Sequence, residues 1–146
     1  MNKKEIHYQI PLRGIKVSTN KIYAGTNWKS RSEIKNRILD VAESFCQPIQ
    51  RVKSYPVAIE YRFIFGTKPL DTTNCAYLVK MLEDALCALK IIKDDAPQFV
   101  ASTFITVNSA PKSQGAEKLD AKSKRDNAKD KDWLEIIIKP YERKTQ

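Results

Sequence analysis

The sequence has little that thiolate or histidine chemistry could use. Its three cysteines, Cys46, Cys75 and Cys87, are widely spaced with no Cys-x-x-Cys pair, and its only histidine is His7. Zinc sites draw on closely spaced cysteines and histidines, and Ser-His-Asp or Cys-His mechanisms need a histidine beside the nucleophile. We therefore expect reduced thiols in a cytoplasmic protein, with any catalysis carried by carboxylates and lysines.

Long hydrophobic runs are also absent. The apolar stretches are only a few residues long, against the ~20 needed to span a bilayer, and the first residues contain no segment of signal-peptide length. The 146 residues are 42% hydrophobic and 29% charged, a composition typical of a folded protein. The sequence thus predicts one domain over residues 1–146, neither membrane-bound nor secreted.

Positive charge is present in excess and is unevenly distributed. The formal net charge is +9, and residues 1–55 hold eleven Lys and Arg against four Asp and Glu. The lysine-rich segment 111–132 holds seven basic residues against five acidic ones. The excess therefore lies in the N-terminal part, which favours an acidic polymer, and nucleic acid before membrane, as the partner.

Basic and aromatic side chains alternate in the loop-like stretch 13–29. This pattern suits phosphate contact and stacking on an unpaired base, although the aromatic residues can equally pin the loop to the core. The following polar helix face adds two more cations. The candidates for DNA contact are Lys16, Lys21, Tyr23, Lys29, Lys35 and Arg37, with Trp28 more typical of the core.

Hydrophobic periodicity predicts four strands and two helices. Alternation indicates strands at 6–10, 57–65, 99–107 and 133–139, and helical spacing indicates helices at 32–46 and from Asn74 to about Leu89. Ser30 and Glu33 have the spacing of a capping box for the first helix. The element order predicts an α+β fold with two helices packed on one face of a mixed, mostly antiparallel sheet.

The segment 109–132 differs from its surroundings. It has one leucine and no aromatic residue, which is too little apolar surface to hold it in a core. We expect a polar, mobile insertion, formed either as a long hairpin connection between the last two strands or as a loose helical turn around residues 117–128.

Four aspartates lie at or near the ends of the second helix: Asp71 before it, Asp84 within it, and Asp94 and Asp95 after it. A helix of ~15 residues is ~22 Å long, so its two ends do not touch. A shared Mg²⁺ site would need the chain after Leu89 to double back along the helix, or a second subunit. The alternative is a set of solvated loop carboxylates.

Four stretches of the chain resemble the RusA-type family of Holliday junction resolvases (crossover junction endodeoxyribonucleases) of phages and prophages. They are IHYQIPLRGIKVSTNKIYAG with its Asn-x-x-Tyr element at Asn20 and Tyr23, the helix RSEIKNRILDVAESF, the strand PVAIEYRFIF, and LDTTNCAYLVKMLEDALCALKIIKDDAPQFV. The last stretch is the most specific. It keeps the family's lysine as Lys80, its Asp-Ala-Leu from Asp84 onward and its Asp-Asp at Asp94 and Asp95.

The upstream Asp-x-Asp-Asn motif of the family is altered. Without a gap, its two aspartates align with Asn74 and Ala76. With one extra helical turn, Asp71 and Asn74 match and Thr73 replaces the second aspartate. We prefer the second alignment because it keeps an Asp-x-x-Asn unit directly after the strand and loop. One usual metal ligand is replaced in either case.

The resemblance implies a Mg²⁺-dependent endonuclease, with Mn²⁺ as a possible substitute, that resolves four-way junctions in recombination and repair. It implies Asp71, Asp94 and Asp95 as metal ligands and Lys80 as the contact to the scissile phosphate, so that Asp71, Lys80 and Asp95 are the catalytic residues. Asp84 would orient Lys80 from position i+4.

The same resemblance adds Asn20 to the DNA-binding residues and implies a cytoplasmic, phage- or prophage-encoded protein. Symmetric resolution needs two opposed cuts, so we expect a homodimer. The alternative is a degenerate relative that binds branched or duplex DNA without cutting it.

Overall fold

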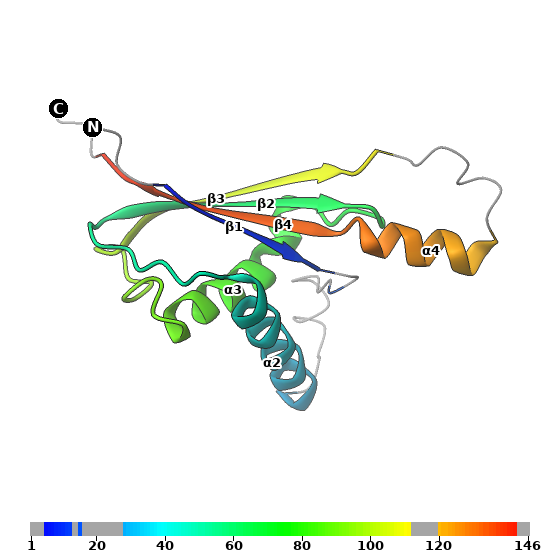
Figure 1. Cartoon of the computed structure of the whole chain (residues 1–146), viewed down its shortest axis with the longest axis horizontal. Coiled ribbons are helices and arrows are strands. Elements are labelled where there is room, and N and C mark those ends of the chain that lie inside the picture. The colour runs from blue at the N-terminus through cyan, green and yellow to red at the C-terminus, as the bar shows by residue number, and fades with distance from the viewer. Residues whose placement is uncertain (1–4, 13–14, 16–27, 112–119, 143–146) are drawn as a thin grey trace.

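The computed structural model describes residues 5–12, 15, 28–111 and 120–142, and of residues 28, 29 and 125–127 it describes the backbone alone. Figure 1 shows the arrangement of the elements. In chain order they are β1 (Ile6–Pro11), α2 (Trp28–Phe45), β2 (Val57–Phe65), the 3₁₀ helix η1 (Thr72–Cys75), α3 (Ala76–Ala88), β3 (Val100–Ser109), α4 (Ala121–Asp130) and β4 (Trp133–Pro140).

The four strands form one mixed sheet in the order β1-β4-β2-β3. β4 runs antiparallel to both β1 and β2, whereas β2 and β3 are parallel. The parallel pair is possible because η1 and α3 carry the chain back across the sheet between the two strands, as a βαβ unit requires. The expectation of an α+β fold with a mixed, mostly antiparallel sheet is confirmed.

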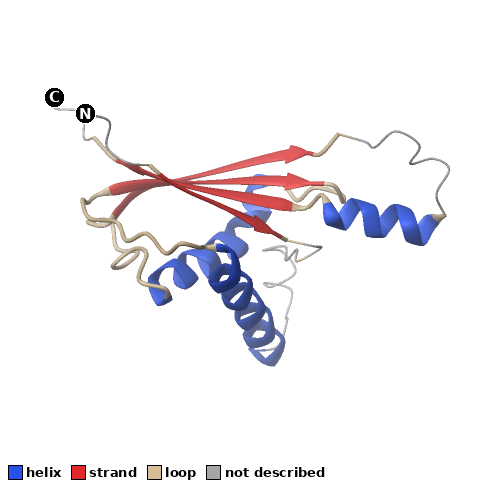
Figure 2. Cartoon of the chain, in the orientation of Figure 1, coloured by secondary structure: helices blue, strands red, loops and turns tan. Residues whose placement is uncertain are grey.

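Helices α2 and α3 cover the same face of the sheet, and α4 extends beyond the sheet where β2 ends and β4 begins (Figures 1 and 2). The expectation of two helices on one face is therefore confirmed, and α4 is an additional helix. No helix of the described residues is long and apolar enough to cross a membrane.

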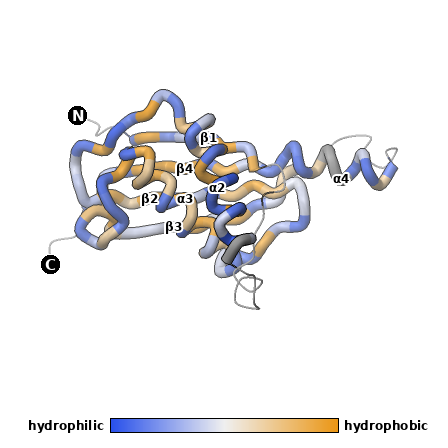
Figure 3. The backbone as a smooth tube through the Cα atoms, turned by 90° about the horizontal axis from the view of Figure 1, so that it is seen from below, coloured by the Kyte–Doolittle hydropathy of each residue, from blue (hydrophilic) through white to orange (hydrophobic). Residues whose placement is uncertain are grey.

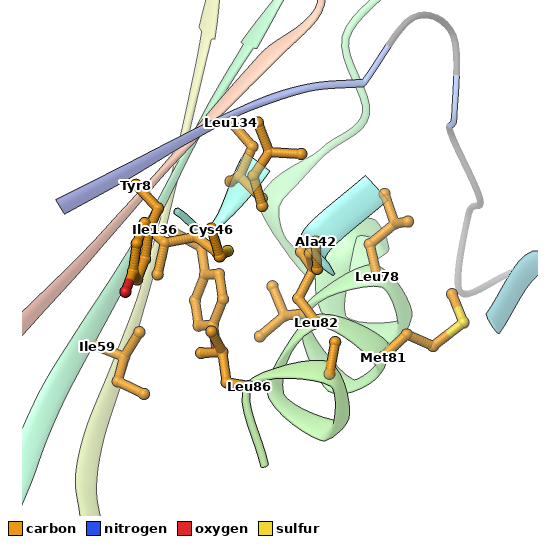
Figure 4. Packing of buried hydrophobic residues seen from close by; sticks show 14 of the residues in the cluster. Tyr8, Ala42, Cys46, Ile59, Leu78, Met81, Leu82, Leu86, Leu134 and Ile136 are labelled. Atoms are coloured by element: carbon orange, nitrogen blue, oxygen red, sulfur yellow. The ribbon is translucent and has the colours of Figure 1, made fainter. Parts of the chain in front are cut away.

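The core lies between the sheet and the two helices. Alternate residues of β2 face inward, and α3 meets them with leucines at intervals of four residues, which place one side of the helix against the sheet. α2 adds the buried residues Ile38 and Ala42 to this core. Figure 4 shows this cluster, which includes Ala42, Cys46, Ile59, Leu78, Leu82, Leu86 and Ile136.

The start of α2 differs from the expectation. The helix begins at Trp28, so Ser30 lies inside its first turn rather than at the N-cap. An N-cap residue needs a non-helical backbone in front of the first turn, so the interpretation of Ser30 and Glu33 as a capping box is wrong.

The connection between β3 and β4 is not a hairpin, because β2 lies between these two strands. The other expectation, a helical turn around residues 117–128, is closer to the observed structure. α4 occupies 121–130 and is capped by the preceding Asp120, whose carboxylate accepts a hydrogen bond of 2.7 Å from the Ser123 amide. Figure 3 shows α4 as a mainly hydrophilic projection, in keeping with the polar composition of this segment.

Asp132 fastens the end of α4 to the rest of the fold. Its side chain is only 1% exposed, and it accepts hydrogen bonds from the Gly66 amide (2.9 Å), the Thr67 amide (3.1 Å) and the Thr67 hydroxyl (3.0 Å). Its carbonyl accepts from the Leu12 amide at 2.8 Å. The ends of β1 and β2 and the start of β4 therefore meet at one buried residue, Asp132.

Gly66 lets α4 approach this point closely. A Cβ atom at Gly66 would lie 2.1 Å from the carbonyl oxygen of Ala128 and 2.6 Å from the Cβ of Lys131. Any side chain would clash with the backbone at the end of α4, so glycine is required here for steric reasons.

Candidate functional site

The chain after α3 reverses direction and returns along the helix. Lys90 adopts a left-handed backbone (φ 61°), and the Ile91 amide then donates a 3.0 Å hydrogen bond to the Leu86 carbonyl. Ile91 and Ile92 are buried against the core and fix this return. The chain after Leu89 therefore doubles back along α3, as a site shared by the distant aspartates would require.

This return places Asp95 beside Lys80 of α3. The Lys80 ammonium lies 2.5 Å from the Asp95 Oδ2 and 3.2 Å from the Asp84 Oδ1. The Asp94 carboxylate accepts the amide of Asp95 at 2.7 Å and so fixes the loop that carries both. We call Lys80, Asp84, Asp94 and Asp95 the Lys80 cluster.

Helix α2 approaches the same cluster with a second cation. The Lys35 ammonium lies 3.9 Å from the Asp84 Oδ2, so Asp84 is contacted from both helices. The side chains of Lys80, Asp84 and Asp95 are partly exposed. A ligand in solution can therefore reach the carboxylates and both ammonium groups.

Electrostatics within the cluster favour its charged state. The hydrogen bond to Asp95 is the main cause of the raised pKa of Lys80, with Asp84 adding to it. The same hydrogen bond holds the pKa of Asp95 below its usual range. Lys80 is therefore a full cation at neutral pH, and Asp95 a carboxylate.

The three cysteines behave differently from catalytic or metal-binding thiols. All three are free, and burial raises the pKa of each of Cys46, Cys75 and Cys87 to about 11. The thiolate is the nucleophile and the metal ligand, so these thiols stay unreactive at neutral pH.

Asp71 lies apart from the Lys80 cluster. It immediately precedes η1, where its carbonyl accepts from the Asn74 and Cys75 amides, and about 15 Å of helix length separates it from Lys80. No three carboxylate, cysteine or histidine side chains of the described part of the chain are placed to hold a metal ion. The expected ligand set of Asp71, Asp94 and Asp95 is thus not assembled in this structure.

The expected DNA-binding residues are described only in part. Lys35 and Arg37 are exposed on α2, as expected for contacts to a phosphate backbone. Lys29 and Trp28 lie in the first turn of α2, but their side chains fall outside the described residues, as do Lys16, Asn20, Lys21 and Tyr23 entirely. Of these expected contacts, Lys35 is the one that the described structure places at the Lys80 cluster.

No protein-family model matches this chain, and no curated protein matches it significantly. The RusA-type resemblance therefore rests on the quoted residues themselves. The structural basis for a function is the contact of Lys80 with Asp84 and Asp95.

Two residues near the cluster escaped the sequence analysis. Tyr61 of β2 is fully buried, and its hydroxyl is the only buried side-chain polar atom of the described residues that has no hydrogen-bond partner. Burial, together with the charges of Glu83, Cys87 and Asp84, raises its pKa. Glu83 is half-buried beside the cluster, and burial followed by the charge of Asp95 raises its pKa. The sequence did contain one sign of the buried hydroxyl, since Tyr61 occupies an inward position in the alternation of β2.

Because the Tyr61 hydroxyl has no partner, we expect its removal to stabilise the protein, whereas most substitutions in a core destabilise it. We expect Tyr61→Phe to raise the free energy of unfolding by about 1 kcal/mol, because it removes a buried polar group that makes no bond within the described fold. The matched control is Tyr8→Phe. The Tyr8 hydroxyl donates to the Pro48 carbonyl (3.1 Å) and accepts from the Gln50 amide (2.8 Å), so its loss should lower stability by about 1–3 kcal/mol.

Urea unfolding of both variants beside the wild-type protein measures the two effects. Equal destabilisation by Tyr61→Phe and Tyr8→Phe would show that the Tyr61 hydroxyl is hydrogen-bonded in solution, and would contradict the prediction.

Proposed function

We propose that this protein is a Mg²⁺-dependent, structure-selective DNA endonuclease that resolves four-way junctions. The observation that carries the proposal is the contact of the Lys80 ammonium with both Asp84 and Asp95. These residues are the parts of the chain that match the resolvase motif best. They meet at one accessible point, although 15 positions separate Lys80 from Asp95.

The donor chemistry of the cluster fits magnesium. Mg²⁺ prefers carboxylate oxygens and is held by one or two carboxylates, with water and substrate phosphate completing its shell. Asp84 and Asp95 converge on a single cation, the Lys80 ammonium, so the same pair can accept a divalent cation once that ammonium moves. Glu83 and Asp94 are the adjacent carboxylates in the chain. This assignment replaces Asp71 with Asp84 as a ligand.

Each residue of the cluster then has a defined role. A bound Mg²⁺ supplies Lewis-acid polarisation of the phosphate and lowers the pKa of a bound water molecule. Lys80 has a long, mobile stem, and its ammonium can turn from the carboxylates to the scissile phosphate and offset the charge that develops there. Lys35 and Arg37 on α2 contact the neighbouring phosphates and orient the strand.

A second candidate is a DNA-binding relative that does not cut. Two observations favour it: Thr73 stands where the preferred alignment expects an aspartate, and Lys80 occupies the position between Asp84 and Asp95. In this case Lys35, Arg37 and the other expected basic contacts would bind branched DNA, and Lys80 would remain the permanent counter-ion of the two carboxylates.

The deciding experiment is an assay of a synthetic four-way junction with the wild-type protein in Mg²⁺, in Mn²⁺ and in EDTA. The endonuclease predicts paired nicks near the branch point that require the divalent cation. Binding of the junction without nicks in either metal supports the second candidate. Absence of binding contradicts both.

Binding of the junction is expected to weaken steeply with salt. Each phosphate contact lowers log affinity by ~0.9 per unit of log salt, so about four contacts weaken binding ~100-fold between 50 and 200 mM. Fluorescence anisotropy at four salt concentrations gives the slope. A Lys35→Ala, Arg37→Ala double variant should reduce the slope by about 2, whereas Lys129→Ala on α4 should leave it unchanged. A flat salt dependence would contradict a phosphate-binding role.

A further inference from the structure

A recess of about 420 Å³ lies at the end of the sheet where β1 and β2 begin and β4 ends. Ile6, Val57 and Ile138, one from each of these strands, give it an apolar floor. Residues 50–54 of the connection between α2 and β2 form a further wall. We call this the 50–54 recess. Its volume is in the range of small-molecule pockets, in which an apolar lining holds the ligand and a few polar groups orient it.

The wall of the 50–54 recess is fixed on both sides of Arg51. The Gln50 amide donates a 2.8 Å hydrogen bond to the Tyr8 hydroxyl. The Val52 amide donates a 2.9 Å hydrogen bond to the Ile91 carbonyl. Both acceptors belong to buried residues of the core. The recess is therefore formed before a ligand binds, and binding costs little in ordering the loop.

The same wall carries two cations without a counter-ion in the described part of the chain. Arg51 and Lys53 are exposed, and neither side chain forms an ion pair or a hydrogen bond with a described residue. By contrast, Lys35, Arg62 and Lys80 each contact a carboxylate. None of the residues that line the recess is acidic. Uncompensated positive charge thus stands beside an apolar floor.

Lys139 also lines the recess, but its charge is already engaged. The hydrogen bond from Arg62 and, after it, the charge of Lys139 lower the pKa of Glu60. Arg51 and Lys53 are therefore the two cations of the recess that are open to a ligand.

We propose that the 50–54 recess binds an organic anion with an apolar body, of the class of medium-chain carboxylates and phosphate esters. The body covers Ile6, Val57 and Ile138, and its removal from water supplies the affinity. The anionic head lies between Arg51 and Lys53, and the planar guanidinium of Arg51 can donate to two of its oxygens at once. A DNA duplex fits poorly, because its outward phosphates bring no apolar group to the floor.

The 50–54 recess shares no residue with the Lys80 cluster. The proposal therefore goes beyond cleavage of DNA and depends on no part of it. Its test uses the full chain without metal and does not measure cleavage.

The first measurement is a fluorescence titration with anilinonaphthalene sulfonate, an anion whose rings fluoresce strongly once they leave water. The wild-type protein should show one saturable site per chain. An Arg51→Gln, Lys53→Gln double variant should bind the probe at least ~10-fold more weakly, because each hydrogen bond to a charged group contributes more than a neutral one. The matched control is Lys122→Gln, Lys124→Gln, which removes two exposed lysines at the same spacing from α4. It should bind like the wild type.

Competition with the probe then separates the two parts of the ligand. Butyrate, hexanoate and octanoate should displace it with a potency that rises ~3- to 4-fold for each added methylene, because each one buries further apolar surface. Octanol tests the body alone and inorganic phosphate the head alone. Each should be at least ~10-fold weaker than the matching eight-carbon anion, octanoate or octyl phosphate. The stronger of these two anions identifies the head group.

Circular dichroism and urea unfolding show whether each variant is folded. If the double variant does not fold, Arg51→Gln alone and the chain-length series still decide the question. The proposal is overturned by a wild type without saturable binding, by a folded Arg51→Gln, Lys53→Gln protein that binds the probe normally, or by octanol that competes as well as octanoate. Displacement of the probe by a four-way junction but not by octanoate would assign Arg51 and Lys53 to DNA, and would overturn it as well.

Discussion

An Asp95→Asn variant is expected to lose junction cleavage, by at least 100-fold in rate, and to keep junction binding. The amide preserves the shape of the carboxylate but removes the negative charge that Mg²⁺ requires of its ligand. Removing a carboxylate from a surface that faces phosphates also reduces repulsion, so binding should be equal or tighter. Cleavage and binding of one junction are measured for the variant and the wild type, in Mg²⁺ and in EDTA.

Asp40→Asn is the matched control, because it removes one exposed carboxylate from α2 outside the Lys80 cluster. It should cut like the wild type. Equal cleavage by Asp95→Asn and Asp40→Asn would refute the role of Asp95. A wild type that binds and does not cut would instead select the DNA-binding relative.

Stability should change little in Asp95→Asn, since the ion pair with Lys80 is partly exposed and such pairs contribute about 0–1 kcal/mol. The contribution of this ion pair to stability depends on pH in a direction that the pKa of Asp95 fixes. Because Lys80 lowers the pKa of Asp95 from its ordinary value of 3.8, the contribution is complete above that value and is lost as the pH falls through the lowered pKa. The free energy of unfolding of the wild type should therefore decrease below pH 3.8 by an amount that the variant does not show. Acid-unfolding curves of the two proteins measure this difference.

Asp132→Ala is expected to lower the free energy of unfolding by about 3 kcal/mol, the largest loss we expect from a single side chain that is not hydrophobic. The carboxylate is buried, and its removal leaves the Gly66 and Thr67 amides without the acceptor they use. Each unsatisfied buried donor costs about 1–3 kcal/mol. For a chain of this length, the melting temperature should fall by roughly 10 °C.

Asp130→Ala serves as the control, because Asp130 is exposed and lies two residues earlier in the same polar segment. Its effect should stay within about 0.5 kcal/mol. Similar losses in the two variants, measured by calorimetry, would mean that Asp132 is not the anchor of this end of the sheet.

The strands and the α3 leucines were predictable because their apolar residues repeat with the periods of a strand and a helix. The parallel pairing of β2 with β3 was not predictable, since the long polar segment after β3 suggested a hairpin with β4. The meeting of Asp95 with Lys80 depends on the left-handed backbone at Lys90, a residue type that rarely signals such a turn. Asp132 was hidden for another reason: a carboxylate within a run of lysines and aspartates looks solvated, and only the approach of Gly66 and Thr67 buries it.

The position of β4 in the sheet sets the order in which the molecule can be assembled. Ile6 pairs with Ile138, nearly the whole chain apart, and within the described sheet β1 contacts no strand except β4. During synthesis on a ribosome, the β2-α3-β3 unit is complete long before β4 leaves the exit tunnel. Until then β1 has no partner and β2 has an open edge, with Ile6, Tyr8 and Ile10 exposed to chaperones and to other nascent chains. The native sheet therefore cannot form before β4 has left the tunnel, and contacts this distant in sequence make its formation slow for a domain of this size.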